Sequence, residues 1–92
     1  MRGMTRVEIN VSGRVQGVGF RYYVHNRIQK YDITGYIQNL PNGSVKAVFE
    51  GKIADVQAAV AICKIGPATA NISDHTEMHC DYSGEFTTFQ IR

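Results

Sequence analysis

The sequence predicts an α+β fold in which an antiparallel sheet is covered on one face by two helices. In several short segments apolar residues occupy every second position, as they do in half-buried strands. In two longer segments apolar residues recur every three or four positions, as they do in amphipathic helices. The chain has 92 residues, enough for one core and too few for two, so residues 1–92 are expected to form a single domain.

The first part of the chain changes from a strand pattern to a helix pattern. Residues 5–11 alternate apolar and polar side chains, which predicts a strand. Residues 12–19 contain three glycines and are expected to form a loop. From Phe20 the apolar spacing becomes helical, and this first helix is expected to end near Asp32.

The middle of the chain predicts a β-hairpin. Residues 34–40 and 45–50 have strand patterns, and the second of them places Val45, Ala47 and Phe49 on one face. The Pro-Asn-Gly sequence at 41–43 is a turn signal, because proline fixes the first turn dihedral and glycine tolerates positive φ. Gly51 is expected to end the second of these strands.

The remaining segments complete the predicted topology. Residues 53–65 have helical spacing, and the Gly-Pro pair at 66–67 is expected to end that helix. Residues 70–79 and 87–91 are expected to be strands. The predicted order is βαββαβ with an extra C-terminal strand, which is the order of a ferredoxin-like sandwich. The core face of the second helix is expected to contain Ile53, Val56, Val60 and Cys63.

Composition and charge limit the classes of function. The hydrophobic fraction of 43% and the charged fraction of 20% are ordinary for a globular protein. No apolar stretch approaches the roughly 20 residues of a membrane span, and a cytoplasmic location is expected. Basic residues concentrate in residues 1–30, but they are too sparse to indicate a nucleic-acid-binding surface. Cys63 and Cys80 have no metal-ligand spacing and are expected to be reduced, although the sequence leaves a bridge between them open.

The segment at 13–21, between the first strand and the first helix, is the most informative part of the sequence. Its glycines allow successive main-chain N–H groups to converge on one point, and a helix N-terminus follows directly. Arg21 adds a planar, permanently charged group that suits two phosphate oxygens. These features predict an anion site. The alternative is a tight connection without a ligand, since the glycine spacing fits neither the Walker nor the dinucleotide pattern.

Two motifs in the chain resemble the signatures of the acylphosphatase family. The stretch GRVQGVGFR at 13–21 agrees with every fixed position of the first signature, G-x-V-Q-G-V-x-[FY]-R. The second signature, about G-[FYW]-[AVC]-x-N-x3-G-x-V-x5-G, falls on residues 35–51 and departs only at Ile37, which is bulkier than the usual residue. The resemblance continues through the Gly-Pro pair at 66–67 to the closing residues 89–92, so it covers nearly the whole chain.

The resemblance implies a hydrolase that splits the carboxyl–phosphate bond of acyl phosphates into a carboxylate and inorganic phosphate. It implies that Arg21 and Asn39 are the catalytic residues, with Asn39 orienting the attacking water. No cofactor, metal or nucleic acid is expected, and the partner is a small-molecule acyl phosphate bound by a monomer. The residues that would hold the substrate phosphate are Val15, Gln16, Gly17, Val18, Gly19, Phe20 and Arg21.

Rival interpretations remain at the level of sequence. The same loop could belong to a non-catalytic anion-binding or regulatory module, or to an inactive relative, since the fold alone does not define an activity. Asn39 could simply end a strand by bonding to its own backbone. An RNA-binding module would present aromatic side chains on its central strands. The predicted strand at 45–50 has only Phe49, on the face assigned to the core, which disfavours that rival.

Overall fold

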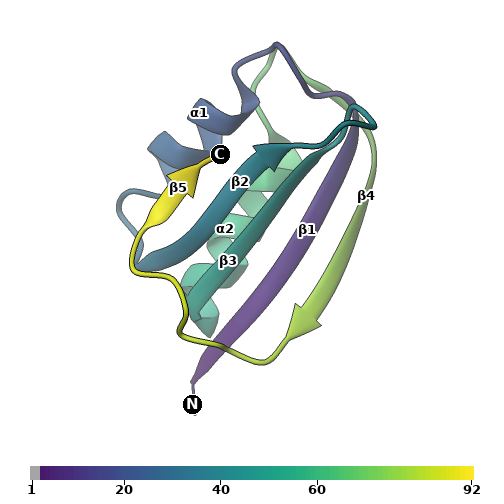
Figure 1. Ribbon diagram of the computed structural model, residues 1–92. Coiled ribbons are helices and arrows are strands. Elements are labelled where there is room, and N and C mark those ends of the chain that lie inside the picture. The colour runs from purple at the N-terminus through teal and green to yellow at the C-terminus, as the bar shows by residue number, and fades with distance from the viewer. Residues whose placement is uncertain (1–2) are drawn as a thin grey trace.

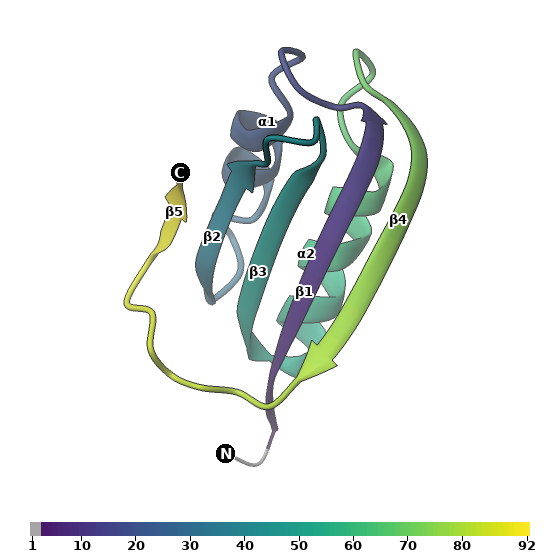
Figure 2. The same ribbon diagram turned by 45° about the vertical axis from the view of Figure 1, so that its right-hand side comes forward.

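A computed structural model describes residues 3–92 of the protein, so the first two residues of the predicted single domain lie outside the described part. Within these residues, five strands form one sheet in the order β4-β1-β3-β2-β5. Helices α1 and α2 both pack on the same face of this sheet (Figures 1 and 2), so the predicted α+β sandwich is confirmed. The elements in chain order are β1 (Met4–Arg14), α1 (Phe20–Arg27), β2 (Ile33–Asn39), β3 (Val45–Lys52), α2 (Ile53–Ile65), β4 (Asn71–Cys80) and β5 (Phe89–Ile91).

The sheet is mixed, because its last strand is parallel to its neighbour. The pairs β1–β3, β1–β4 and β2–β3 are antiparallel, as the sequence predicts. The prediction of an antiparallel sheet is wrong for the last strand, because β5 is parallel to β2. Residues 81–88, here called the crossing segment, carry the chain from β4 at one edge of the sheet to β5 at the other edge (Figure 1). The segment crosses at the end of the sheet where β2 begins, so β5 runs in the same direction as β2.

The core lies between the sheet and the two helices. The inward faces of β1 and β3 meet in register, with Val7 opposite Phe49 and Ile9 opposite Ala47. All of these side chains are buried, which confirms the inward face predicted for β3. Strand β3 is the middle strand of the five, and β1 pairs with it on one side and with β4 on the other.

Two strands are longer than the sequence predicts, and each continues through a glycine. The strand at 5–11 was expected to stop before Ser12, but β1 continues to Arg14 with a bulge between Ser12 and Gly13. Gly51 was expected to end a strand, but it lies within β3 and pairs with both Thr5 and Ile33. A Cβ atom at Gly51 would lie 2.6 Å from the Asp32 carbonyl oxygen, so glycine here marks a close backbone approach.

The first helix is shorter than predicted, and the second has the predicted length. Helix α1 ends at Arg27, not near Asp32, and a tight turn follows in which the Tyr31 N–H donates to the Ile28 carbonyl at 2.9 Å. That turn keeps the spacing of three between Ile28 and Tyr31, which explains why the pattern still looks helical. Helix α2 has the predicted bounds, but Ile53 was wrongly assigned to the core, since it is 47% exposed at the first helical position.

Candidate active site

The connection from β1 to α1 contains two glycines with positive φ, Gly17 and Gly19, directly before the helix N-terminus. Gly19 caps the helix with φ 78° and ψ 19°, a left-handed conformation that side-chain-bearing residues avoid. The Gly19 carbonyl accepts the Tyr23 N–H at 3.0 Å, which starts the helical ladder. The N–H groups of the first turn have no partner within a helix, and they carry the positive end of its dipole.

A small cavity of about 100 Å³ lies where this connection meets the end of β2. It brings together Arg21 from the first turn of α1 and Asn39 from the last position of β2. Asn39 is exposed and Arg21 is half-buried, so both side chains are accessible from outside. The lining residues are Val15, Gly17, Gly19, Phe20, Arg21, Tyr22 and Asn39.

Gln16 lies in the loop but not on the cavity wall, because its side chain points to the β2–β3 turn. Its Nε2 atom donates to the main-chain oxygens of Leu40 at 2.8 Å and Ser44 at 2.9 Å. The amide therefore ties the loop to the residue that follows Asn39. These two hydrogen bonds therefore link the loop that precedes Arg21 to the turn that follows Asn39.

Val18 also lies off the cavity wall, and its surroundings hold the other side of the loop. The Thr69 hydroxyl donates to the Val18 carbonyl oxygen at 2.8 Å. Phe20, which opens α1, is buried against Gly66, where a Cβ atom would lie 2.8 Å from the Phe20 ring. The loop is thus anchored at both ends by contacts distant in sequence, while Gly17 and Gly19 line the cavity.

The residue that follows β5 holds the Arg21 side chain. Arg21 Nη1 donates to the main-chain oxygen of Arg92 at 2.7 Å. Arg92 is itself held in place, since its N–H donates to the Ile37 carbonyl at 2.8 Å and its guanidinium lies 3.9 Å from the Tyr36 ring centroid. One nitrogen of Arg21 thus has a fixed protein partner, and the remaining N–H donors of the guanidinium can serve a ligand.

The charge at this end of the molecule favours an anion. Helix α1 has no acidic residue in its first turn, so no carboxylate competes for its N–H groups from within the helix. Within residues 3–92, none of the ion pairs involves Arg21. The cavity is therefore lined by a permanent cation, a helix N-terminus and a neutral amide.

Other reactive groups lie away from this cavity. Both cysteines are free, and burial raises the pKa of the Cys63 thiol to about 12, so it is not a thiolate nucleophile. Among the described residues, no group of three or more His, Cys, Asp or Glu side chains is placed to hold a metal ion. His75 and His79 flank Glu77 on β4 at 3.6 and 3.5 Å, at the opposite edge of the sheet from β5. No helix in the described part of the chain is long and apolar enough to cross a membrane.

Sequence reasoning did not identify three residues that form or support the cavity. Tyr22 lines it with a side chain that is 61% exposed, and its position directly after Arg21 is the signal that could have found it. Thr69 and Arg92 support the loop and Arg21 from far along the chain. No local pattern marks those two contacts.

The fold and the glycine loop before α1 define the class as a ferredoxin-like α+β protein with donors gathered at a helix N-terminus. The sequence model described as Acylphosphatase matches residues 7–91. An acylphosphatase of Geotalea uraniireducens is 40% identical over 86 residues, which cover 94% of each chain. The chain belongs to the acylphosphatase family and is an enzyme with acyl phosphate hydrolase activity.

Solved structures agree with this assignment. The crystal structure of acylphosphatase from Bacillus subtilis superposes with a TM-score of 0.89 at 31% identity, covering 96% of this chain and 98% of that one. A structure of full-length HypF in the phosphate- and nucleotide-bound form gives a TM-score of 0.83 at 28% identity. It covers 97% of this chain but only 12% of the HypF chain, so the same fold also occurs as a small part of a longer protein.

Proposed function

We propose that the loop N–H groups and Arg21 hold the phosphate of an acyl phosphate while Asn39 orients the attacking water. The observation that carries this proposal is the shared cavity, which brings Arg21 and Asn39 together from separate elements. Its volume of about 100 Å³ is smaller than the roughly 300–1,000 Å³ of pockets that enclose whole ligands. A site of this size holds the phosphoryl group and leaves the acyl group outside, next to the exposed Tyr22.

The chemistry needs few further groups because the substrate is already activated. The leaving group is a carboxylate of low basicity, so it departs without a general acid. A phosphate oxygen of the substrate can accept the proton of the attacking water. What remains for the protein is positioning and stabilisation of charge, which dominate catalysis of phosphoryl transfer.

Each part of the cavity has a defined task in this proposal. The N–H groups of the loop and of the first turn of α1 donate to the equatorial phosphoryl oxygens as the group becomes planar. Arg21 contributes the nitrogens that Arg92 does not occupy, and the contact with Arg92 holds the guanidinium before the substrate arrives. Asn39 uses its side-chain amide to align a water with the bond to the leaving carboxylate.

The experiment is hydrolysis of benzoyl phosphate in the presence of EDTA by the wild-type protein, Arg21→Ala and Asn39→Ala. We expect both substitutions to lower turnover about 100- to 1,000-fold, the usual loss when one preorganised contact is removed. Inorganic phosphate should bind weakly to Arg21→Ala and with nearly wild-type affinity to Asn39→Ala. Arg27→Ala and Asn26→Ala remove the same side-chain types from exposed positions of α1 and serve as matched controls.

Three results would contradict these assignments. Equal loss of phosphate affinity in both site variants would overturn the separate roles of Arg21 and Asn39. Loss of wild-type turnover in EDTA would overturn metal-independent action. Hydrolysis of a phosphate monoester at a rate similar to that of benzoyl phosphate would overturn the dependence on an activated leaving group.

We also propose that the enzyme acts as a cytoplasmic monomer on a small molecule and without nucleic acid. The sparse positive charge of the sequence supports the last point. The HypF similarity gives no reason to prefer a non-catalytic role, because the aligned region is only 12% of a protein described as phosphate- and nucleotide-bound.

A further inference from the structure

Glu50 is a carboxylate enclosed on the sheet face opposite the helices. It lies in β3 directly opposite Arg6 of β1, and its side chain has no exposed surface. The crossing segment covers it and supplies hydrogen-bond donors. The Ser83 N–H and hydroxyl donate to Glu50 Oε2 at 3.0 and 2.6 Å, and the Gly84 N–H donates to Oε1 at 3.0 Å. Both oxygens of the buried carboxylate are therefore satisfied by the crossing segment.

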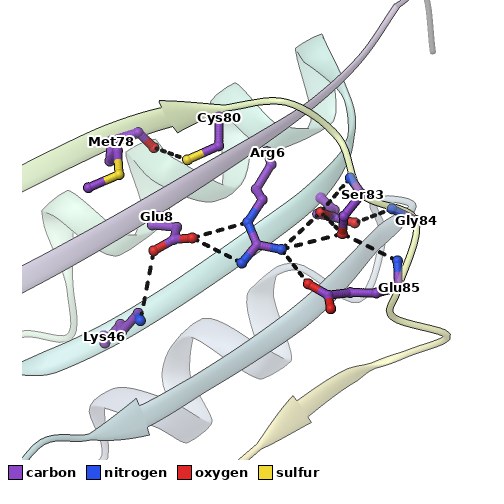
Figure 3. Close-up of polar contacts among 9 residues, drawn as sticks. Arg6, Glu8, Lys46, Met78, Cys80, Ser83, Gly84 and Glu85 are labelled. Carbon is purple, nitrogen blue, oxygen red and sulfur yellow. Dashed lines mark hydrogen bonds and ion pairs between the residues drawn. The ribbon is translucent and has the colours of Figure 1, made fainter.

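Arg6 makes a second set of contacts with the crossing segment. Its Nη1 atom donates to Glu50 at 3.1 Å and to Glu85 of the crossing segment at 2.8 Å (Figure 3). Its Nε and Nη2 atoms donate to Glu8 at 3.1 and 2.9 Å, which holds the guanidinium over β1. The Arg6 guanidinium also lies 5.5 Å from the Phe86 ring centroid. The crossing segment is thus fixed to the two central strands by charged groups.

The crossing segment leads directly to the residues that hold Arg21. Strand β5 has only three residues and forms the edge of the sheet, so its own pairing is limited. The Thr88 carbonyl at the end of the crossing segment accepts the Gly35 N–H at 3.0 Å. Strand β5 then ends at Ile91, and the next residue, Arg92, has the main-chain oxygen that accepts the Arg21 hydrogen bond at 2.7 Å. The position of this acceptor therefore depends on where the crossing segment is fastened.

We propose that Glu50 is a positioning residue for Arg21, acting through the crossing segment and β5 on the acceptor that aligns the guanidinium. This inference rests on the proposed role of Arg21 in holding the substrate phosphate. Glu50 does not touch substrate, since it lies at the other end of the sheet and faces away from the helices. Its effect is expected on phosphate affinity more than on the chemical step.

The main variant is Glu50→Gln, which keeps the size of the side chain and replaces one oxygen acceptor with a donor. That donor would face either the Gly84 N–H or Arg6, so the crossing segment loses part of its attachment. We expect the Kd for inorganic phosphate and the KM for benzoyl phosphate to rise about tenfold, as for one charge-assisted contact that is loosened. The kcat should change much less.

Glu77→Gln is the matched control. Glu77 is also an ion-paired carboxylate, with Lys64 as its partner, but it lies on β4 at the opposite edge of the sheet from β5. Urea unfolding of both variants shows how much stability each one loses. A purely structural role for Glu50 predicts unchanged phosphate affinity in the folded fraction of Glu50→Gln, as in Glu77→Gln, and that result would overturn the inference.

A double-mutant cycle tests whether the effect passes through Arg21. Phosphate affinity is measured by NMR titration at high phosphate concentration for Arg21→Ala with and without Glu50→Gln. We expect no further loss from Glu50→Gln in the Arg21→Ala background, and independent, additive losses would contradict the inference. If Glu50→Gln does not fold, Ser83→Ala removes the hydroxyl contact to Glu50 together with the longer contacts from Arg6 and the Glu85 N–H. A rise in Kd that again vanishes in the Arg21→Ala background is then expected.

The two proposals fail in different ways. Wild-type phosphate affinity in Arg21→Ala would refute the proposed function itself. Weak phosphate binding by Arg21→Ala together with wild-type affinity in Glu50→Gln would leave the proposed function intact and refute only the role of Glu50.

Discussion

Two regions of this molecule gather main-chain N–H groups and an arginine, and they differ in the source of the anion. In the crossing segment, the N–H groups of Ser83 and Gly84 and the guanidinium of Arg6 surround the carboxylate of Glu50. In the loop before α1, Gly17 and Gly19 line a cavity together with Arg21. Within residues 3–92, the N–H groups of residues 15–19 donate to no other main-chain group.

The difference shows how one arrangement serves two ends. A carboxylate that belongs to the chain is always present at the crossing segment, so the contacts there stabilise the fold. At the loop no acidic side chain occupies the first turn of α1, so the same kinds of donors can bind an anion from solution. The distinction predicts that matched substitutions affect stability in one region and ligand affinity in the other.

The largest contrast is expected between the two arginines. Arg6→Ala leaves the buried Glu50 without its cationic partner and should lower the free energy of unfolding by about 3 kcal/mol. Arg21→Ala should lower turnover about 100- to 1,000-fold. It should leave the free energy of unfolding nearly unchanged, because the Arg21 side chain is half-buried and makes no ion pair among the described residues. Urea denaturation and benzoyl phosphate kinetics on both variants measure the contrast.

Similar losses of stability in the two arginine variants would remove the distinction between the regions. Arg27→Ala, on the exposed side of α1, shows how much either quantity changes when an arginine is removed from neither region.

A smaller effect is expected when alanine replaces a glycine of the loop. Gly19 has φ 78° and Gly43, in the β2–β3 turn, has φ 92°, and a Cβ atom at either position has no heavy atom within 4 Å. Both substitutions should therefore cost about 1–2 kcal/mol of stability through backbone strain alone. Only Gly19→Ala should weaken phosphate binding, since it shifts the N–H groups at the start of α1, and calorimetric titration with phosphate compares the two. Equal affinities would mean that the conformation of Gly19 does not shape the anion site.

The smallest effect concerns the acid limit of stability. Burial of Glu50 favours its neutral form, but the hydrogen bonds from Ser83, Arg6 and Gly84 outweigh burial and lower the pKa of the carboxyl below 4.5. Since the folded-state pKa is the lower one, the contribution of Glu50 is fully present above the pKa of the unfolded chain. It is lost as pH falls through the folded-state pKa. Burial and the hydrogen bonds shift the pKa of Glu50 in opposite directions, so we expect only a small change of unfolding free energy with pH.

Unfolding free energies of the wild type and Glu50→Gln, measured from pH 7 down to pH 2, test this dependence. The difference between the two proteins should be constant near neutral pH and shrink in acid. A difference that grows in acid would mean that the pKa of Glu50 is raised and that burial dominates.

Sequence patterns predicted the elements well where a local signal sets the boundary. The end of α2 was predicted to the residue, because Gly66 takes a positive φ that caps the helix and Pro67 cannot continue it. The end of α1 was predicted wrongly, because Tyr31 keeps a helical spacing in a turn that is no longer helical. The parallel pairing of β5 has no local signal at all, since it depends on the path of the crossing segment around the sheet.

The candidate site was predictable to the extent that it is encoded in one stretch of chain. Arg21 and Asn39 were named from motifs, and the structure places both on one cavity. The hydrogen bonds from the Gln16 side chain to the β2–β3 turn were not predicted, because the sequence of a loop does not tell where a side chain points. The hydrogen bonds to Glu50 were also not predicted, because α2 and β4 separate Glu50 from its partner Ser83 in the sequence.

The contact between Arg21 and the main-chain oxygen of Arg92 has a practical consequence for handling the protein. Any tag, dye or fusion partner joined after Arg92 begins within hydrogen-bond distance of the arginine proposed to hold the phosphate. Strand β1 starts at the opposite end of the sheet from the point where β5 finishes (Figure 1). We therefore expect a label attached directly after Arg92 to lower phosphate affinity more than a label attached before β1.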